Sequence, residues 1–176
     1  MSEVLRFRRC RQQALLDLLT ALGLTVQVVA DEATIPGSFW GDEEAGLIGN
    51  TIYIRADTPV HSALHEACHF VCMDEQRRKS LHTNAGGDAD EENAVCYLQI
   101  LLSDALPDLG RARIFKDMDT WGYSFRLGNA KAWFENDATD ALQWLSGRGL
   151  IEVAEKLTHA DAVSYTHLTL PTIYSV

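Results

Sequence analysis

The stretch that decides the fold is residues 59–73, which read Pro-Val-His-Ser-Ala-Leu-His-Glu-Ala-Cys-His-Phe-Val-Cys-Met. Within it, His65, Glu66 and His69 form an HExxH motif. Two imidazoles four residues apart lie on one face of a helix and can reach a single zinc ion at about 2.0–2.1 Å. Glu66 is placed beside them to accept a proton from a metal-bound water. Because so short a pattern also occurs by chance, its surroundings must support it.

The apolar residues around the motif fall on the opposite helical face from the two histidines. At about 100° per residue, that apolar face consists of Val60, Ala63, Leu64, Ala67, Phe70 and Val71. Asp57 or Thr58 can cap the helix and Pro59 suits its first position, so we expect it to run to about Met73. One alternative is a pair of hydrogen-bonded core histidines, which is disfavoured because neither histidine lies on the apolar stripe. The other is a pair of solvated surface histidines.

The sequence on both sides of this helix predicts an α+β domain. Helical spacing, strand alternation and the turn pair Gly49-Asn50 define most of the boundaries. The expected elements are a helix over residues 4–22, a strand over 24–28, a hairpin of 46–48 and 51–55, a polar linker over 80–87, a helix over 90–106 ended by Pro107, and a helical remainder.

A catalytic zinc site needs a third protein ligand and one open position. A third histidine in the extended motif is absent, so a carboxylate from the acid-rich start of the helix over 90–106 is the expected ligand. Glu91 shares a helical face with an apolar stripe of Ala94, Val95, Leu98 and Leu102, whereas Glu92 shares a face with Gln99. A carboxylate on an inward face needs a compensating charge, so we predict that Glu91 binds the zinc. The neighbouring acids then compensate the helix dipole.

Composition limits the partners and the compartment. A chain of 176 residues that is 47% hydrophobic can bury one core, and its net charge of −10 comes without a basic cluster beyond residues 6–11. Direct nucleic-acid binding is therefore not expected. No signal peptide or membrane-spanning stretch is apparent, which predicts a cytoplasmic protein whose four cysteines are reduced thiols.

Residues 163–176 differ from the rest of the chain because they contain no Asp, Glu, Lys or Arg. They resemble the translated read-through of a sequencing adapter, and such segments are left out of fold reasoning. A genuine β-rich tail is the alternative. We expect one zincin-like metallopeptidase domain over residues 1–162 and a non-native tail over 163–176.

The motif set resembles the ImmA/IrrE-type minimal gluzincins over most of the stretch from Leu24 to Pro107. The resemblance implies a minimal zincin fold, in which a small antiparallel or mixed sheet packs on the HExxH helix and a glutamate-bearing helix, with further C-terminal helices. It implies zinc ligands at His65, His69 and Glu91 and a catalytic base at Glu66. It also implies that the strand over 51–55 pairs with an extended substrate peptide. The chain departs from the pattern at Val95, where relatives usually carry Asn or Asp.

The expected function is zinc-dependent hydrolysis of a peptide bond in a protein or peptide substrate, and the resemblance suggests a transcriptional regulator or a toxin-antitoxin or phage-related partner. A donor for the developing oxyanion is needed as well, and Tyr123 or His82 could supply it. The alternatives are a zinc-containing regulatory module that binds a protein partner, or a zinc hydrolase of non-peptide substrates.

Overall fold

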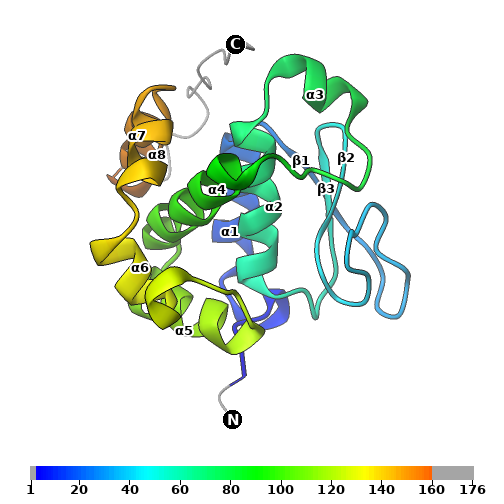
Figure 1. The fold of residues 1–176 in the computed structure, drawn as a ribbon. Coiled ribbons are helices and arrows are strands. Elements are labelled where there is room, and N and C mark those ends of the chain that lie inside the picture. Colours follow the sequence, from blue (N-terminus) through cyan, green and yellow to red (C-terminus); the bar gives the residue numbers. More distant parts are fainter. Residues whose placement is uncertain (1–2, 160–176) are drawn as a thin grey trace.

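The computed structural model describes residues 3–159, which form an α+β arrangement in which α2 lies between a small sheet and α4 (Figure 1). The helices are α1 Gln12–Ala21, α2 Val60–Cys72, α3 Glu75–Ser80, α4 Ala89–Leu102, α5 Gly110–Trp121, α6 Ala130–Asn136, α7 Thr139–Ser146 and α8 Leu150–His159. The strands are β1 Thr25–Val28, β2 Gly46–Ile48 and β3 Thr51–Ile54. The segment 163–176, predicted to be a non-native tail, lies outside the described residues.

The sheet is mixed and has the order β1-β3-β2. β3 pairs in parallel with β1 and antiparallel with β2, so the predicted hairpin around Gly49 is confirmed. The prediction that residues 51–55 pair with a substrate strand is wrong, because β3 is the central strand and both of its edges are occupied. The outer edge of β2 is also engaged: the Leu47 N–H donates to the Gly37 carbonyl at 3.3 Å, and its carbonyl accepts from the Thr83 N–H at 2.9 Å.

The first helix begins later than its apolar spacing predicted. Residues 4–8 instead lie along the segment that leads into α2, where the Phe7 N–H donates to the Thr58 carbonyl and the Val60 N–H donates to the Leu5 carbonyl. The Leu5 N–H donates to the buried Asp117 carboxylate at 2.9 Å. These long-range bonds satisfy backbone groups that a helix would otherwise use, so the helical stretch α1 starts only at Gln12.

The helix with the motif is buried on its apolar side as expected. Its back face packs in the core between the sheet and α4, and Val60, Leu64 and Ala67 are fully buried. Its start differs from the prediction, because Pro59 is the N-cap residue and no side chain caps the helix. Thr58 accepts from the Arg55 N–H instead, and Asp57 forms an ion pair with Arg55.

Two features of the remaining chain bear on the site. The linker predicted over residues 80–87 is preceded by a short helix, α3, whose N-terminus is capped by Asp74 through the Arg77 N–H. α4 ends at Leu102, and a 3-10 turn, Ser103–Ala105, completes the predicted helix. Among the described residues, no helix is both long and apolar enough to cross a membrane.

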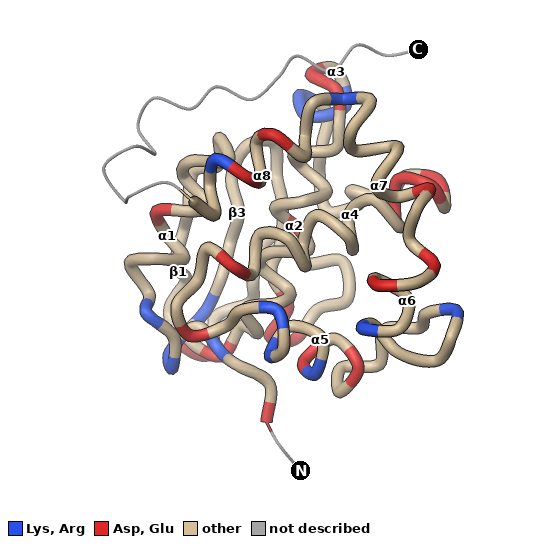
Figure 2. Tube along the Cα trace, turned by 90° about the vertical axis from the view of Figure 1, so that its left-hand side faces the viewer, with Lys and Arg blue, Asp and Glu red and all other residues tan. Residues whose placement is uncertain are grey.

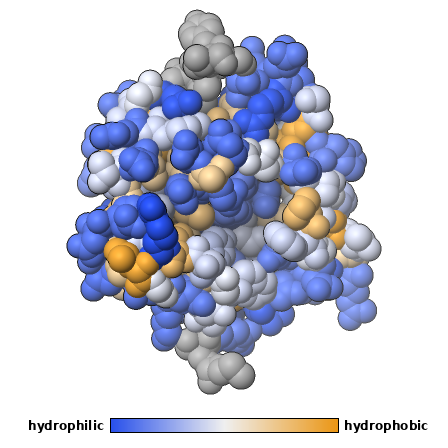
Figure 3. Space-filling model, in the orientation of Figure 1, coloured by the Kyte–Doolittle hydropathy of each residue, from blue (hydrophilic) through white to orange (hydrophobic). Residues whose placement is uncertain are grey.

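The outer surface of the described residues is polar and mixed in charge. Figure 2 shows acidic and basic residues interspersed over the outer helices. On the face seen in Figure 1, hydrophilic side chains cover most of the surface and hydrophobic ones form a few separate clusters (Figure 3). Two exposed aromatic side chains, Phe39 and Trp40, project from the loop before β2, with 52% and 74% of their surface accessible.

Candidate metal centre

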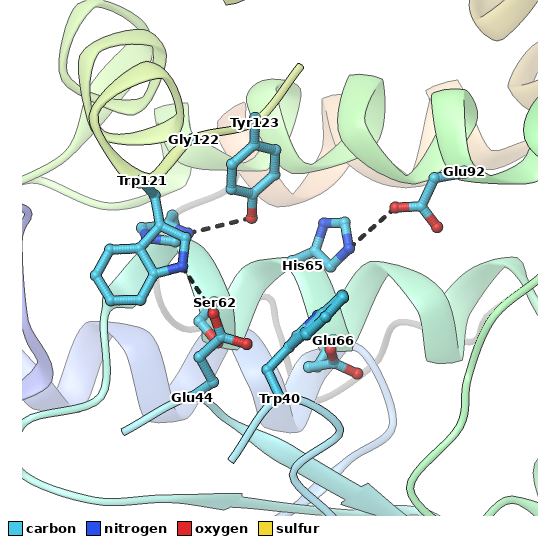
Figure 4. Close-up of a pocket in the computed structure, with 10 residues that line it drawn as sticks. Trp40, Glu44, Ser62, His65, Glu66, Glu92, Trp121, Gly122 and Tyr123 are labelled. Atoms are coloured by element: carbon cyan, nitrogen blue, oxygen red, sulfur yellow. Dashed lines mark hydrogen bonds and ion pairs between the residues drawn. The ribbon is translucent and has the colours of Figure 1, made fainter. Parts of the chain in front are cut away.

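Three side chains from α2 and α4 converge on one point. Two of them, His65 and Glu92, are seen in Figure 4. His65 and His69 come from successive turns of α2, and Glu92 comes from the first turn of α4. The His65 and His69 Nε2 atoms are 3.2 Å apart. The Glu92 carboxylate lies 3.1 Å from His65 Nε2 and 3.2 Å from His69 Nε2. The described residues thus present a triangle of two imidazole nitrogens and one carboxylate group, in which His65 faces Oε1 of Glu92 and His69 faces Oε2.

The size of this triangle fits a tetrahedral metal ion. Ligands at about 2.0–2.1 Å with tetrahedral angles are separated by about 3.3 Å. This is close to the 3.2 Å between the two imidazole nitrogens and to the distance from each nitrogen to its own oxygen of Glu92. A donor set of two histidines and one glutamate, with a fourth position open to a cleft, is the set that catalytic zinc sites use. The residues present therefore fit a zinc ion.

The hydrogen bonds of His65 define which of its ring nitrogens is directed at Glu92. Gln99 Nε2 donates to the His61 carbonyl at 2.8 Å, which fixes Gln99 Oε1 as the atom 3.1 Å from His65 Nδ1. His65 must therefore donate from Nδ1, and its Nε2 faces the Glu92 carboxylate at 3.1 Å. When His65 is protonated, this Nε2 donates to Glu92; when His65 is neutral, the same nitrogen carries the lone pair that a metal ion can take.

The ionisation of Glu92 agrees with this arrangement. Burial opposes ionisation, but hydrogen bonds from His65 and His69 hold the pKa of the Glu92 carboxyl well below its usual range. The Glu92 carboxylate is therefore ionised in the folded protein near neutral pH. His69 is held by packing, because it is 5% exposed and its Nδ1 has no hydrogen-bond partner among residues 3–159.

The prediction that Glu91 is the third ligand is wrong. Glu91 is buried at 7% exposure, as its inward stripe indicated, but its carboxylate faces Arg77 of α3. Arg77 makes a two-pronged contact, with Nη1 2.7 Å from Oε2 and Nη2 3.0 Å from Oε1. A guanidinium therefore supplies the compensating charge that was assigned to zinc, and the adjacent Glu92 faces the histidines.

Glu66 lies in the cleft that opens beside the three ligands. Two lobes of about 340 Å³ and about 210 Å³ meet there, and both are bordered by Trp40, His65, Glu66 and Glu92. Burial raises the pKa of the Glu66 carboxyl, while the two histidines oppose that shift. A carboxylate with a raised pKa next to a metal position is suited to accepting and releasing a proton. The structure thus brings together His65, Glu66 and His69 as the motif predicted.

Tyr123 also reaches this cleft, from the segment after α5. Its hydroxyl lies 3.1 Å from His61 Nδ1 and 3.3 Å from Gln99 Nε2, so it belongs to the same hydrogen-bond network that orients His65. Burial raises the pKa of Tyr123 to about 12 and lowers the pKa of His61 to about 3, so the phenol keeps its proton and the imidazole is neutral. His82 is exposed, bonds to Thr83 and borders neither lobe.

Sequence reasoning missed three residues around the site. Gln99 orients His65 by accepting from its Nδ1, which leaves Nε2 directed at Glu92. Glu44 and Trp40 border the cleft from the loop before β2. The sequence did carry a signal for Gln99, which lies seven residues after Glu92 on the same face of α4. No local pattern marked Glu44 or Trp40.

Comparison with known proteins gives no family to set beside this geometry. The resemblance to minimal gluzincins therefore stays an expectation from the motifs, and function follows only from the residues of the site. The chain matches no protein-family model, no curated protein and no solved structure.

Proposed function

We propose that this protein is a zinc-dependent peptidase. The observation that supports it most is the triangle of His65 Nε2, His69 Nε2 and the Glu92 carboxylate group beside an additional carboxylate, Glu66, in an open cleft. A structural zinc site closes all four positions with protein ligands, whereas this one leaves room for water and substrate. The second carboxylate, Glu66, then acts as a base and not as a ligand.

Each residue has a separate part in the proposed reaction. Bound zinc would polarise the scissile carbonyl and lower the pKa of water in the site to about 7. Glu66 accepts the proton of the attacking water and passes it to the leaving amine, for which its raised pKa is suited. Tyr123 keeps its phenolic proton and is the candidate donor to the oxyanion.

The shape of the cleft favours a peptide over a small non-peptide substrate. Its two lobes extend from the metal position in both directions along α2, one toward His61 and Ser62 and the other toward His69. An extended chain can pass through both lobes with its scissile bond at the centre. Because both edges of β3 are paired, the substrate is held by side-chain contacts in these lobes and by the flanking loops.

A Glu66→Gln variant tests this function. We expect it to keep stoichiometric zinc, because Glu66 is not a ligand, and to lose at least about 100-fold of its hydrolytic rate. Glu152→Gln, which changes an exposed glutamate on α8, is the matched control and should behave as the wild type. Zinc is measured in the purified proteins by elemental analysis, and cleavage with a proteome-derived peptide library. Equal cleavage by the Glu66→Gln and wild-type proteins would refute the proposal, as would purified protein that binds no zinc.

A further inference from the structure

The larger lobe of the cleft has a chemical character of its own. Three aromatic side chains, Trp40, Trp121 and Tyr123, border it, and the Glu44 carboxylate lies among them (Figure 4). They come from two separate segments, the loop before β2 and the end of α5 with the residues that follow. Aromatic faces around a carboxylate are the surroundings that stabilise an organic cation, through cation–π attraction and direct charge pairing.

Glu44 is available to such a cation. Its Oε1 accepts from the Trp121 indole N–H at 2.7 Å, and this bond holds the carboxylate against the aromatic wall. Within residues 3–159, Glu44 forms no ion pair. The guanidinium of Arg6, which lies 6.0 Å from the Trp121 ring, is paired with Glu3 and Glu43.

The charge of the cleft leaves Glu44 without compensation. No Lys or Arg is among the residues that border either lobe. A zinc ion would balance the carboxylates of Glu92 and Glu66, and the negative charge of Glu44 would remain. The smaller lobe differs, because its own borders are Phe39, His69 and residues 83–86, which include no further carboxylate. A positively charged group is therefore favoured on one side of the reacting centre.

We propose that the larger lobe binds a cationic group of the substrate, with Glu44 as the specificity-determining residue and Trp40 and Trp121 as its aromatic walls. This inference rests on the proposed peptidase function and narrows its substrates. The cation is either the side chain of a lysine or arginine next to the scissile bond or the free α-ammonium group of a peptide.

Three hydroxamates distinguish these cases, because each has the same zinc-binding group and they differ in the ammonium group that they carry. Nα-acetyl-lysine hydroxamate presents a side-chain ammonium, norleucine hydroxamate a free α-ammonium, and Nα-acetyl-norleucine hydroxamate presents neither. Their dissociation constants for the zinc-loaded protein are measured by isothermal titration calorimetry. We expect one of the two cationic compounds to bind about tenfold more tightly than the neutral one, and that compound identifies the source of the cation.

Two adjacent substitutions test the role of Glu44. Glu44→Gln keeps an acceptor for the Trp121 indole and removes only the charge, so the preference should fall below about threefold. The Glu43 carboxylate faces Arg6, so Glu43→Gln should leave the preference for the cationic compound unchanged. Equal binding of all three compounds to the wild type would overturn the inference and leave the metal centre standing. Binding of none would overturn the metal centre itself.

Discussion

Glu91 and Glu92 are neighbours on α4, and their side chains leave the helix about 100° apart. That angle gives them different partners: Glu91 turns toward α3 and Arg77, and Glu92 turns toward α2 and the two histidines. Glu92 retains 45% side-chain exposure because it forms part of the wall of an open cleft, whereas Glu91 is closed off at 9%. Glu92 borders both lobes of the cleft and Glu91 borders neither, so Glu92 is the better candidate for a ligand of a catalytic metal.

Replacing each of the two glutamates by glutamine should separate these roles. Glu92→Gln removes the charged ligand, so we expect zinc to be lost on dialysis against a mild chelator. Glu91→Gln should keep its zinc but lose about 1–3 kcal/mol of unfolding free energy, less than a fully buried pair would cost because Arg77 is 38% exposed. Zinc content and urea unfolding of both variants decide the matter. If the Glu92→Gln variant kept its zinc and the Glu91→Gln variant lost it, Glu91 and not Glu92 would be the zinc ligand.

The error over Glu91 has a physical origin. The apolar stripe of Ala94, Val95 and Leu98 correctly indicated that Glu91 points inward, and a buried carboxylate does need a positive partner. The sequence offers no means of telling a zinc ion from a guanidinium fourteen positions earlier, because Arg77 reaches Glu91 only through the placement of α3. The HExxH residues were predictable because their geometry is contained within one helix.

At the scale of elements, the loop before β2 positions the side chains that distinguish this cleft. The Arg55 guanidinium fastens the loop by donating to the Ala33 carbonyl at 2.7 Å and the Asp42 carbonyl at 3.4 Å. The loop crosses the start of β2 at Gly46, where a β-carbon would overlap the Pro36 carbonyl oxygen and come within 2.5 Å of the Ser38 amide nitrogen. Close backbone approach at this glycine therefore sets the position of Trp40 and Glu44.

A pair of glycine substitutions tests that close approach. Gly46→Ala should destabilise the protein by at least about 3 kcal/mol, because backbone atoms cannot yield as a flexible side chain can. Gly49→Ala lies in the turn of the same hairpin, and its added methyl group has no atom within 4 Å. Its only cost is the backbone strain of placing alanine at φ +58°. It should cost about 1–2 kcal/mol. Urea unfolding of the two variants provides the comparison, and equal losses would contradict the close approach.

The elements themselves were predictable to different degrees. Local patterns were sufficient for α2, α4 and the β2–β3 hairpin, because periodicity and turn residues act within a few positions. The parallel pairing of β1 with β3 and the late start of α1 depend on backbone hydrogen bonds between distant segments. For the same reason the cleft walls at Glu44 and Trp40 carry no sequence signature, since a loop gains its position only from what it packs against.

For the whole molecule, the core and the candidate metal centre lie on opposite faces of α2. The back of α2 belongs to a single hydrophobic cluster that extends from Leu5 to Leu157 through the sheet, α4, α7 and α8. The ligands are on the front, where they join only α2 and α4. A domain with such a core does not need a metal to fold, unlike a small zinc finger, whose folding energy comes from the ion.

Removal of zinc should therefore weaken the protein without unfolding it. A ligand at 1,000 times its dissociation constant stabilises the folded state by about 4 kcal/mol, which corresponds to a fall of roughly 8–16 °C in melting temperature for a domain of this size. We expect chelator-treated protein to keep its far-ultraviolet circular dichroism at 25 °C and to melt cooperatively at the lower temperature. Added zinc should restore the wild type but leave Glu92→Gln unchanged, since that variant lacks the third ligand. Loss of helical signal at 25 °C on chelation would show instead that the ion holds α2 and α4 together. A melting temperature that does not change with zinc would show that the triangle of His65, His69 and Glu92 binds no zinc.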